Sequence, residues 1–131
     1  MSGQGEVFSE FDVVYAYTRA QALADGVLID VTKTARKAGI RFPVAVTANV
    51  WHGYIVPRDS SDLSCQSIEG RLWDTLFLFA LAARGQEGDT LYYDVSYAMK
   101  GRAQKDVKLK AVCGPGDTPE PVITIMLPNE D

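Results

Sequence analysis

The stretch RLWDTLFLFALAAR, from Arg71 to Arg84, decides the fold because it contains the longest strongly apolar run in the chain. Only Asp74 interrupts that run, and helix-forming residues make up most of it. Placed on a helix, its large side chains cover more than one side, and a helix that is apolar on most sides is buried. We therefore predict one main helix over Arg71 to Arg84, buried on nearly all sides. The apolar positions are Leu72, Trp73, Leu76, Phe77, Phe79, Ala80 and Ala83.

After this helix the apolar period changes to two residues, which is typical of half-buried strands. The alternation runs from Leu91 to Met99 and again from Val107 to Cys113. The segments KGRAQK and GPGDTPEP read as the turns between strands. The last strand, Val122 to Leu127, is apolar on both faces, which favours the centre of the sheet. The C-terminal third is thus predicted to be an antiparallel meander.

The N-terminal half predicts short helices, because threonines precede its helix-forming stretches and glycines or loops follow them. Thr18 is expected to cap Arg19–Ala24, and Gly26 to end that helix in a left-handed conformation. Two further helices are expected from the same signals. They are Lys33–Ala38, capped by Thr32 and ended by Gly39, and a helix capped by Thr47 that carries Val50, Trp51 and Tyr54.

The remaining segments complete the expected architecture. Ile40 to Val46 is extended, and Pro43 would place it at an edge of the sheet. Val56 to Ser67 reads as a long surface loop, and residues 1–10 as a flexible N-terminus. No linker divides the 131 residues. The sequence predicts a single α+β domain, residues 1–131, with short N-terminal helices and one long buried helix packed on a C-terminal antiparallel β-meander.

The charge of the chain argues against direct nucleic-acid binding. The net charge is −4 and the pI is about 4.9, whereas non-specific nucleic-acid binding depends on neutralising phosphates. The charges are nevertheless uneven, and such asymmetry suits a specific protein partner, although it is also typical of solvated faces. Two basic clusters hold most of the positive charge: Lys33, Arg36, Lys37 and Arg41, and then Lys100, Arg102, Lys105, Lys108 and Lys110.

Soft metal ligands and targeting signals are sparse. Cys65, Cys113 and the single histidine, His52, cannot complete a four-ligand zinc site, so we expect packing thiols, no metal and no cofactor. The first ten residues lack a signal-peptide pattern, and the apolar run is shorter than the ~20 residues that cross a bilayer. A soluble, cytoplasmic protein without a membrane partner is expected. His52 has no nucleophile placed near it by any motif, so no catalytic residue is identified.

Arg71 and Asp74 are the first candidate site. Three residues apart on one helix, they can pair with each other. They could contact a ligand, or they could tie the helix to the N-terminal turns together with Asp30, since a charge beside an apolar helix needs a partner.

The stretch YTRAQALADGVLIDV, Tyr17 to Val31, contains further candidates. Caps and a helix stop explain its threonine and its Asp-Gly pair, whereas Tyr17, Arg19 and Asp30 have no local role. These three are therefore candidate binding residues, together with Arg71, Asp74 and the second basic cluster.

Several long phrases occur in a fixed order: YTRAQALADGVLIDV, AGIRFPVAVT, GRLWD, VCGPGD and PVITIMLP. Together they resemble a family of short, uncharacterised proteins carried on bacterial plasmids and prophages. The resemblance covers the chain from about Phe11 to Asp131. It implies a mobile element inside a bacterial cell as the setting, and it supplies no activity or catalytic residue.

Two functions follow as hypotheses. The first is a non-enzymatic accessory factor of a mobile genetic element that binds a protein partner. Its target would be a nucleic-acid-binding host defence complex, inhibited in the manner of an anti-CRISPR or antirestriction protein. The alternative is a small enzyme or nucleic-acid-processing factor, which requires Arg19, Asp30, Arg71 and Asp74 to converge on one open cleft.

Overall fold

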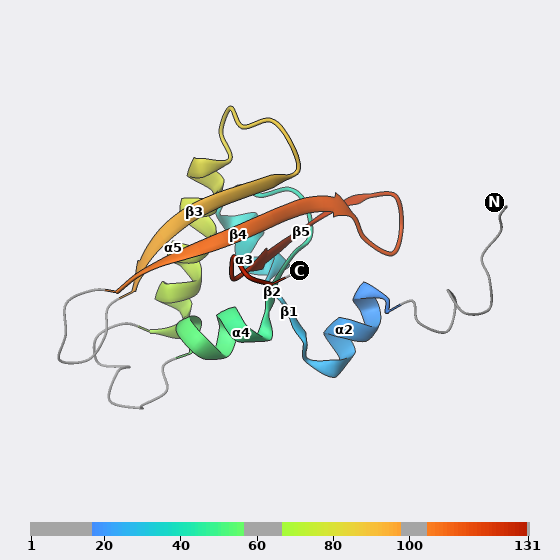
Figure 1. The fold of residues 1–131 in the computed structure, drawn as a ribbon, viewed down its shortest axis with the longest axis horizontal. Helices are drawn as coiled ribbons and strands as arrows, with labels where there is room; N and C mark the ends of the chain where they lie inside the picture. Colours follow the sequence, from blue (N-terminus) through green and yellow to red (C-terminus); the bar gives the residue numbers. More distant parts are fainter. Residues whose placement is uncertain (1–16, 57–66, 98–104, 131) are drawn as a thin grey trace, which may run out of the picture.

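The computed structural model describes residues 17–56, 67–97 and 105–130, and shows a mixed sheet with helices packed against it (Figure 1). The five strands run in the order β1-β2-β5-β4-β3. The strands are β1 (Leu28–Asp30), β2 (Val44–Thr47), β3 (Thr90–Tyr97), β4 (Lys105–Pro115) and β5 (Pro121–Met126). The helices are α2 (Arg19–Asp25), α3 (Thr32–Lys37), α4 (Ala48–Val50), which continues into the π-helical turn η1 (Trp51–Ile55), and α5 (Ile68–Ala82). The predicted α+β class is confirmed.

The C-terminal meander forms as predicted. β3 pairs with β4, and β4 with β5, in antiparallel register, and β5 is the central strand. The two-residue period places Tyr93, Val95 and Tyr97 in the core, while the residues between them are exposed. We call the face of β5 that carries Ile123 and Ile125 the core face of the sheet, and the opposite face the open face.

The position of β2 corrects the expectation of an edge strand. β2 lies between β1 and β5, parallel to β5, and all of its residues are buried. Pro43 comes directly before the strand, so its missing N–H removes no ladder bond. Its carbonyl accepts a hydrogen bond from the Ile123 amide at 2.9 Å. The edges of the sheet are instead β1 and β3.

The main helix, α5, is longer at its start and less buried than predicted. It begins after Ser67, whose hydroxyl accepts a hydrogen bond from the Gly70 amide at 2.9 Å and so caps the helix. One side packs on the core face through Leu72, Leu76 and Phe79. Burial on nearly all sides is wrong, because the opposite side has no covering element among the described residues. That side exposes Trp73, Phe77 and Leu81.

The short helices follow the predicted caps with one exception. Thr18 caps α2 in a capping box with Gln21, and Gly26 ends it at φ 78°. Thr47 caps α4 through the Val50 amide. Thr32, however, is the first residue of α3 and does not cap it. Its hydroxyl donates to Asp30 at 2.5 Å, because the preceding strand brings that carboxylate within reach.

Helices lie on both faces of the sheet. α3 and α5 cover the core face, where Ala35 of α3 joins the hydrophobic core. α2 lies against part of the open face, where Ala22 is buried. No helix in the described ranges is long and apolar enough to cross a membrane. The predictions for residues 1–10, for most of the 56–67 loop and for the KGRAQK turn fall outside the described residues.

Candidate functional site

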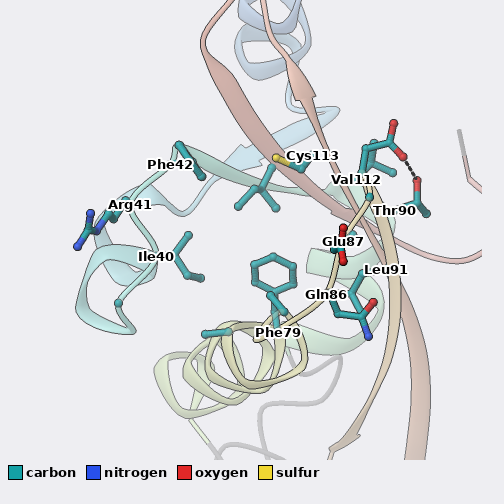
Figure 2. Close-up of a pocket in the computed structure, with 17 residues that line it drawn as sticks. Ile40, Arg41, Phe42, Phe79, Gln86, Glu87, Thr90, Leu91, Val112 and Cys113 are labelled. Atoms are coloured by element: carbon teal, nitrogen blue, oxygen red, sulfur yellow. Dashed lines mark hydrogen bonds between the residues drawn. The ribbon is translucent and has the colours of Figure 1, made fainter.

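The main candidate site is an apolar pocket of about 420 Å³ at the C-terminal end of α5 (Figure 2). We call it the apolar pocket. Figure 2 shows the ring of Phe79 at its centre, between Ile40 on one side and Leu91 on the other. Phe42, 43% exposed, contributes a large apolar side chain to the lining. The Cys113 side chain reaches the pocket from β4.

Local sequence explains why this space is open. Ala80 of α5 and Ala83, the residue directly after this helix, line the pocket, and their small side chains leave room that a leucine would occupy. The chain then turns away from the helix through Gly88, whose φ of 99° suits glycine. The Cys113 amide donates to the Asp89 carbonyl at 2.7 Å and fixes this turn to β4. This bond holds the 86–90 segment beside β4 at the border of the pocket.

The chemistry of the apolar pocket favours binding over reaction. Its polar side chains are those of Arg41 and of the 86–90 segment, including Gln86 and Glu87. Cys113 is a free thiol, but the only histidine of the chain, His52, is exposed on η1 and does not line the pocket. The carboxylates of Glu87 and Asp89 also line the pocket, yet most of its lining residues are apolar. The pocket is suited to holding an apolar group.

Two predicted site residues, Tyr17 and Arg19, line a second hollow, a groove of about 730 Å³ beside α2 on the open face of the sheet. Arg19 lines it and is held in place, since its guanidinium donates to the Thr124 hydroxyl at 2.6 Å and to the Ile123 carbonyl at 3.0 Å. Burial lowers the pKa of Arg19, and the carboxylates of Asp30 and Asp117 oppose that effect. Arg19 therefore connects α2 to β5.

The other polar side chains around α2 also form hydrogen bonds that hold this helix in place. The Asp117 carboxylate accepts hydrogen bonds from the Arg19 and Ala20 amides at 2.7 and 2.9 Å, which stabilises the start of the helix. Tyr17, which is exposed, donates to the Asp25 carboxylate at 2.6 Å, and this hydrogen bond raises the pKa of Tyr17. These bonds explain the polar residues of the N-terminal stretch that had no local role.

Arg71 lies in a buried polar network on the other side of the sheet. It is 2% exposed, and its Nη1 donates to the Tyr54 carbonyl at 2.8 Å. The Thr75 hydroxyl donates to the Arg71 carbonyl at 2.8 Å and lies 2.6 Å from the Tyr97 hydroxyl. The Tyr93 hydroxyl donates to the Thr75 carbonyl at 2.9 Å. The network joins α5 to β3 and to η1.

The four residues of the enzyme hypothesis are not brought into one cleft. Arg19 and Asp30 lie at the open face of the sheet, whereas Arg71 and Asp74 belong to α5 on the core face. Asp74 is half-buried and lines a hollow of about 500 Å³ beside α3. The sheet therefore separates Arg19 and Asp30 from Arg71 and Asp74.

The second basic cluster is only partly described. Lys100 and Arg102 lie outside the described residues, and of Lys105 only the backbone, at the start of β4, is described. The Lys108 ammonium is 3.6 Å from the Asp94 carboxylate, and both side chains are exposed. Lys110 donates to the Glu130 carbonyl at 2.5 Å. The two described lysines thus each have a partner within the chain.

Sequence reasoning missed the role of Glu130. The carboxylate accepts hydrogen bonds from the Thr47 hydroxyl at 2.8 Å, the Asn49 side chain at 2.9 Å and the Leu127 amide at 2.7 Å. It missed Phe42 and the apolar pocket as well. No motif marks either one, because both depend on contacts between residues far apart in sequence.

The burial of Tyr93 and Tyr97 predicts how the stability of the folded protein changes with pH. Burial raises the pKa of Tyr97 from 10.0 to about 12, and it also raises the pKa of Tyr93. Below pH 10.0, the tyrosine pKa in the unfolded chain, both the folded and the unfolded chain keep the phenol protons of these tyrosines. Between pH 10 and about 12 the unfolded chain ionises first, so stability should fall with rising pH. Tyr97 alone contributes a slope of about 1.4 kcal/mol per pH unit.

Urea unfolding measured across this alkaline range tests the prediction. Tyr97→Phe should flatten the loss of stability with pH, while Tyr92→Phe, a change at a 53% exposed position, should leave the slope unaltered. Equal slopes for all three proteins would contradict the assignment.

Comparisons with known proteins match residues 5–131 to the model of one family, described as a family of unknown function (DUF6573). No curated protein and no solved structure matches the chain. Among the described residues, no group of three or more His, Cys, Asp or Glu side chains is placed to hold a metal ion.

Proposed function

The chain belongs to DUF6573, and because that family has no known function, we propose one from the geometry: a non-enzymatic protein-binding module that holds an apolar side chain of its partner. The observation that carries this proposal is the apolar pocket. Its volume of about 420 Å³ fits within the range of about 300–1,000 Å³ that binding pockets occupy. Apolar anchors that fill such pockets dominate the energy of many protein interfaces.

The surroundings of the apolar pocket support a protein partner. Phe42 lines the pocket and is 43% exposed, so part of this apolar lining faces outward and can contact a partner. The charged side chains of Arg41 and Glu87 also line the pocket and can orient a partner.

The proposal extends to a biological setting. We place the protein in the bacterial cytoplasm as an accessory factor of a mobile genetic element, where it would inhibit a nucleic-acid-binding host defence complex. The support for this part is the resemblance to plasmid and prophage proteins and the uneven charge of the chain. The pocket supports only the binding of a protein.

Filling the apolar pocket tests the binding function. Ala83→Leu puts a larger side chain into the pocket, and should reduce capture of the partner from a bacterial lysate by about tenfold or more. Ala24→Leu makes the same chemical change at an exposed position of α2, and this variant should capture as much of the partner as the native protein does. Alkylation of Cys113, followed by mass spectrometry, gives an independent measurement, since a bound partner should protect this thiol. Equal capture by both variants, with no protection of Cys113, would refute the proposal.

The stoichiometry of inhibition separates binding from catalysis. A binding protein should need at least equimolar amounts and leave the target's mass unchanged. Turnover at a ratio of about one to a hundred, or a mass shift in the target, would show an enzyme instead.

A further inference from the structure

The inner wall of the apolar pocket is aromatic. The Phe79 ring lies at its centre (Figure 2), and it also packs against the Tyr93 ring, with centroids 5.9 Å apart and a tilt of 58°. Phe42, from a distant segment, adds a second ring to the lining and is 43% exposed. Aromatic rings attract one another by more than the apolar area they bury, in offset-stacked or edge-to-face arrangements. The pocket therefore offers two rings to a third.

The walls beside these two rings consist partly of small residues. Gly39, Ala80, Ala83 and Gly88 all line the pocket, and they leave a space of about 420 Å³. An aromatic side chain buries about 150–250 Å², and its rigid ring loses little conformational freedom when it is enclosed. A large flat ring is therefore well suited to this space.

Two carboxylates stand at the mouth of the pocket. Glu87 and Asp89 line it, and both are exposed. One Asp89 oxygen accepts a hydrogen bond from the Thr90 hydroxyl at 3.2 Å, and a carboxylate can accept from more than one donor. Figure 2 shows Arg41, the basic residue of the lining, directed away from the Phe79 ring. The mouth thus offers hydrogen-bond acceptors, whereas the inner wall is apolar.

We propose that the apolar pocket receives a tryptophan side chain of the partner protein. The indole ring lies against Phe79 and Phe42, and the indole N–H donates to the carboxylate of Glu87 or Asp89. This inference rests on the proposed protein-binding function and specifies the side chain that is bound. Tryptophan is also among the residues that contribute most to the energy of protein interfaces.

Other side chains match the pocket less well. Leucine and phenylalanine bring no donor for the carboxylates. Tyrosine brings a donor, but its oxygen also carries lone pairs that two nearby carboxylates repel, whereas the indole nitrogen is a donor only. Arginine would pair with the carboxylates, but its remaining N–H groups would lie unpaired against the apolar wall, which is costly.

The test uses N-acetyl amino-acid amides as probes, because they present one side chain without the other contacts of a partner. N-acetyl-tryptophanamide should bind with a dissociation constant of about 1 mM or below. Its analogue methylated on the indole nitrogen keeps the ring but cannot donate, and should bind about tenfold more weakly. The leucine and arginine probes should bind more weakly than N-acetyl-tryptophanamide. Amide NMR shifts of Gly88, Leu91 and Cys113, which line the pocket, measure each affinity.

Variants at the mouth test the hydrogen bond. Glu87→Gln combined with Asp89→Asn removes both charges and keeps the side-chain shapes, so the tenfold preference for the free indole N–H should shrink to about threefold or less. Both positions are exposed, and an asparagine at 89 can still accept from Thr90, so the melting temperature should stay native. Glu69→Gln, the same loss of charge at an exposed position outside the pocket, should keep the full preference.

Pocket filling and competition test the location and the source of the ring. Ala83→Leu should abolish binding of N-acetyl-tryptophanamide, whereas Ala24→Leu, at an exposed position of α2, should leave it unchanged. Saturating N-acetyl-tryptophanamide should also displace the partner captured from a bacterial lysate, because the two compete for one pocket. N-acetyl-leucinamide at the same concentration should displace less.

Four outcomes would overturn the inference. These are no binding of the tryptophan probe, equal binding of its methylated analogue, tighter binding of the leucine or arginine probe, and binding that does not displace the partner, which would assign the pocket to a free aromatic small molecule. If the probes fail while lysate capture still depends on Ala83, the binding function stands and only the choice of tryptophan is wrong. If capture is also insensitive to Ala83→Leu, the proposed function fails too.

Discussion

Leu76→Ala is expected to lower the free energy of unfolding by about 2–5 kcal/mol, the range for removing a fully buried leucine. Leu76 is 0% exposed and packs from α5 into the main core. Truncation removes apolar contacts and leaves a cavity that the sheet can fill only in part. Urea unfolding, with the midpoint and slope fitted together, gives the measurement.

Leu81→Ala is the matched control for that measurement. It is the same substitution on the same helix, but Leu81 is 40% exposed, and it should cost less than about 1 kcal/mol. Equal losses for the two variants would mean that α5 does not have the buried side described here.

Arg71→Ala should destabilise the protein to a similar degree, by about 2–5 kcal/mol. The side chain is 2% exposed, so its loss creates a large cavity. The hydrogen bond from Arg71 Nη1 to the Tyr54 carbonyl, 2.8 Å long, is also lost. Thermal and urea unfolding measure both effects together.

Arg71→Met separates the two contributions. Methionine refills much of the volume without a charge, and apolar replacements of buried charged groups are often tolerated. We expect Arg71→Met to keep a larger part of the stability than Arg71→Ala. Native stability for Arg71→Ala, with loss of partner capture, would instead make Arg71 a binding residue.

The fold could be predicted wherever local patterns carry the information. The alternation from Leu91 to Tyr97 predicted β3 and its buried side, because a strand's side chains alternate between two faces. Thr18 and Gly26 predicted both ends of α2, because caps depend on residues close in sequence. These elements need no knowledge of the rest of the chain.

The candidate sites depend on contacts between residues far apart in the sequence, which no local sequence pattern predicts. The apolar pocket joins Ile40, Phe79 and Cys113, which come from three separate segments. Arg19 and Arg71 were both candidate binding residues from the sequence. In the structure Arg19 connects α2 to β5, whereas Arg71 lies in a buried polar network on the core face of the sheet. Only the pairing of the strands decides which residues share a face.

The sequence by itself determined the α+β class, the central position of β5 and most of the helix caps, since period and capping act over a few residues. The tertiary structure decided that β2 is inserted between β1 and β5, because its burial depends on distant strands. It also decided which side of α5 is left uncovered. An apolar helix must pack against other elements, but the number and position of its neighbours determine which side they cover. Here they leave Trp73, Phe77 and Leu81 exposed.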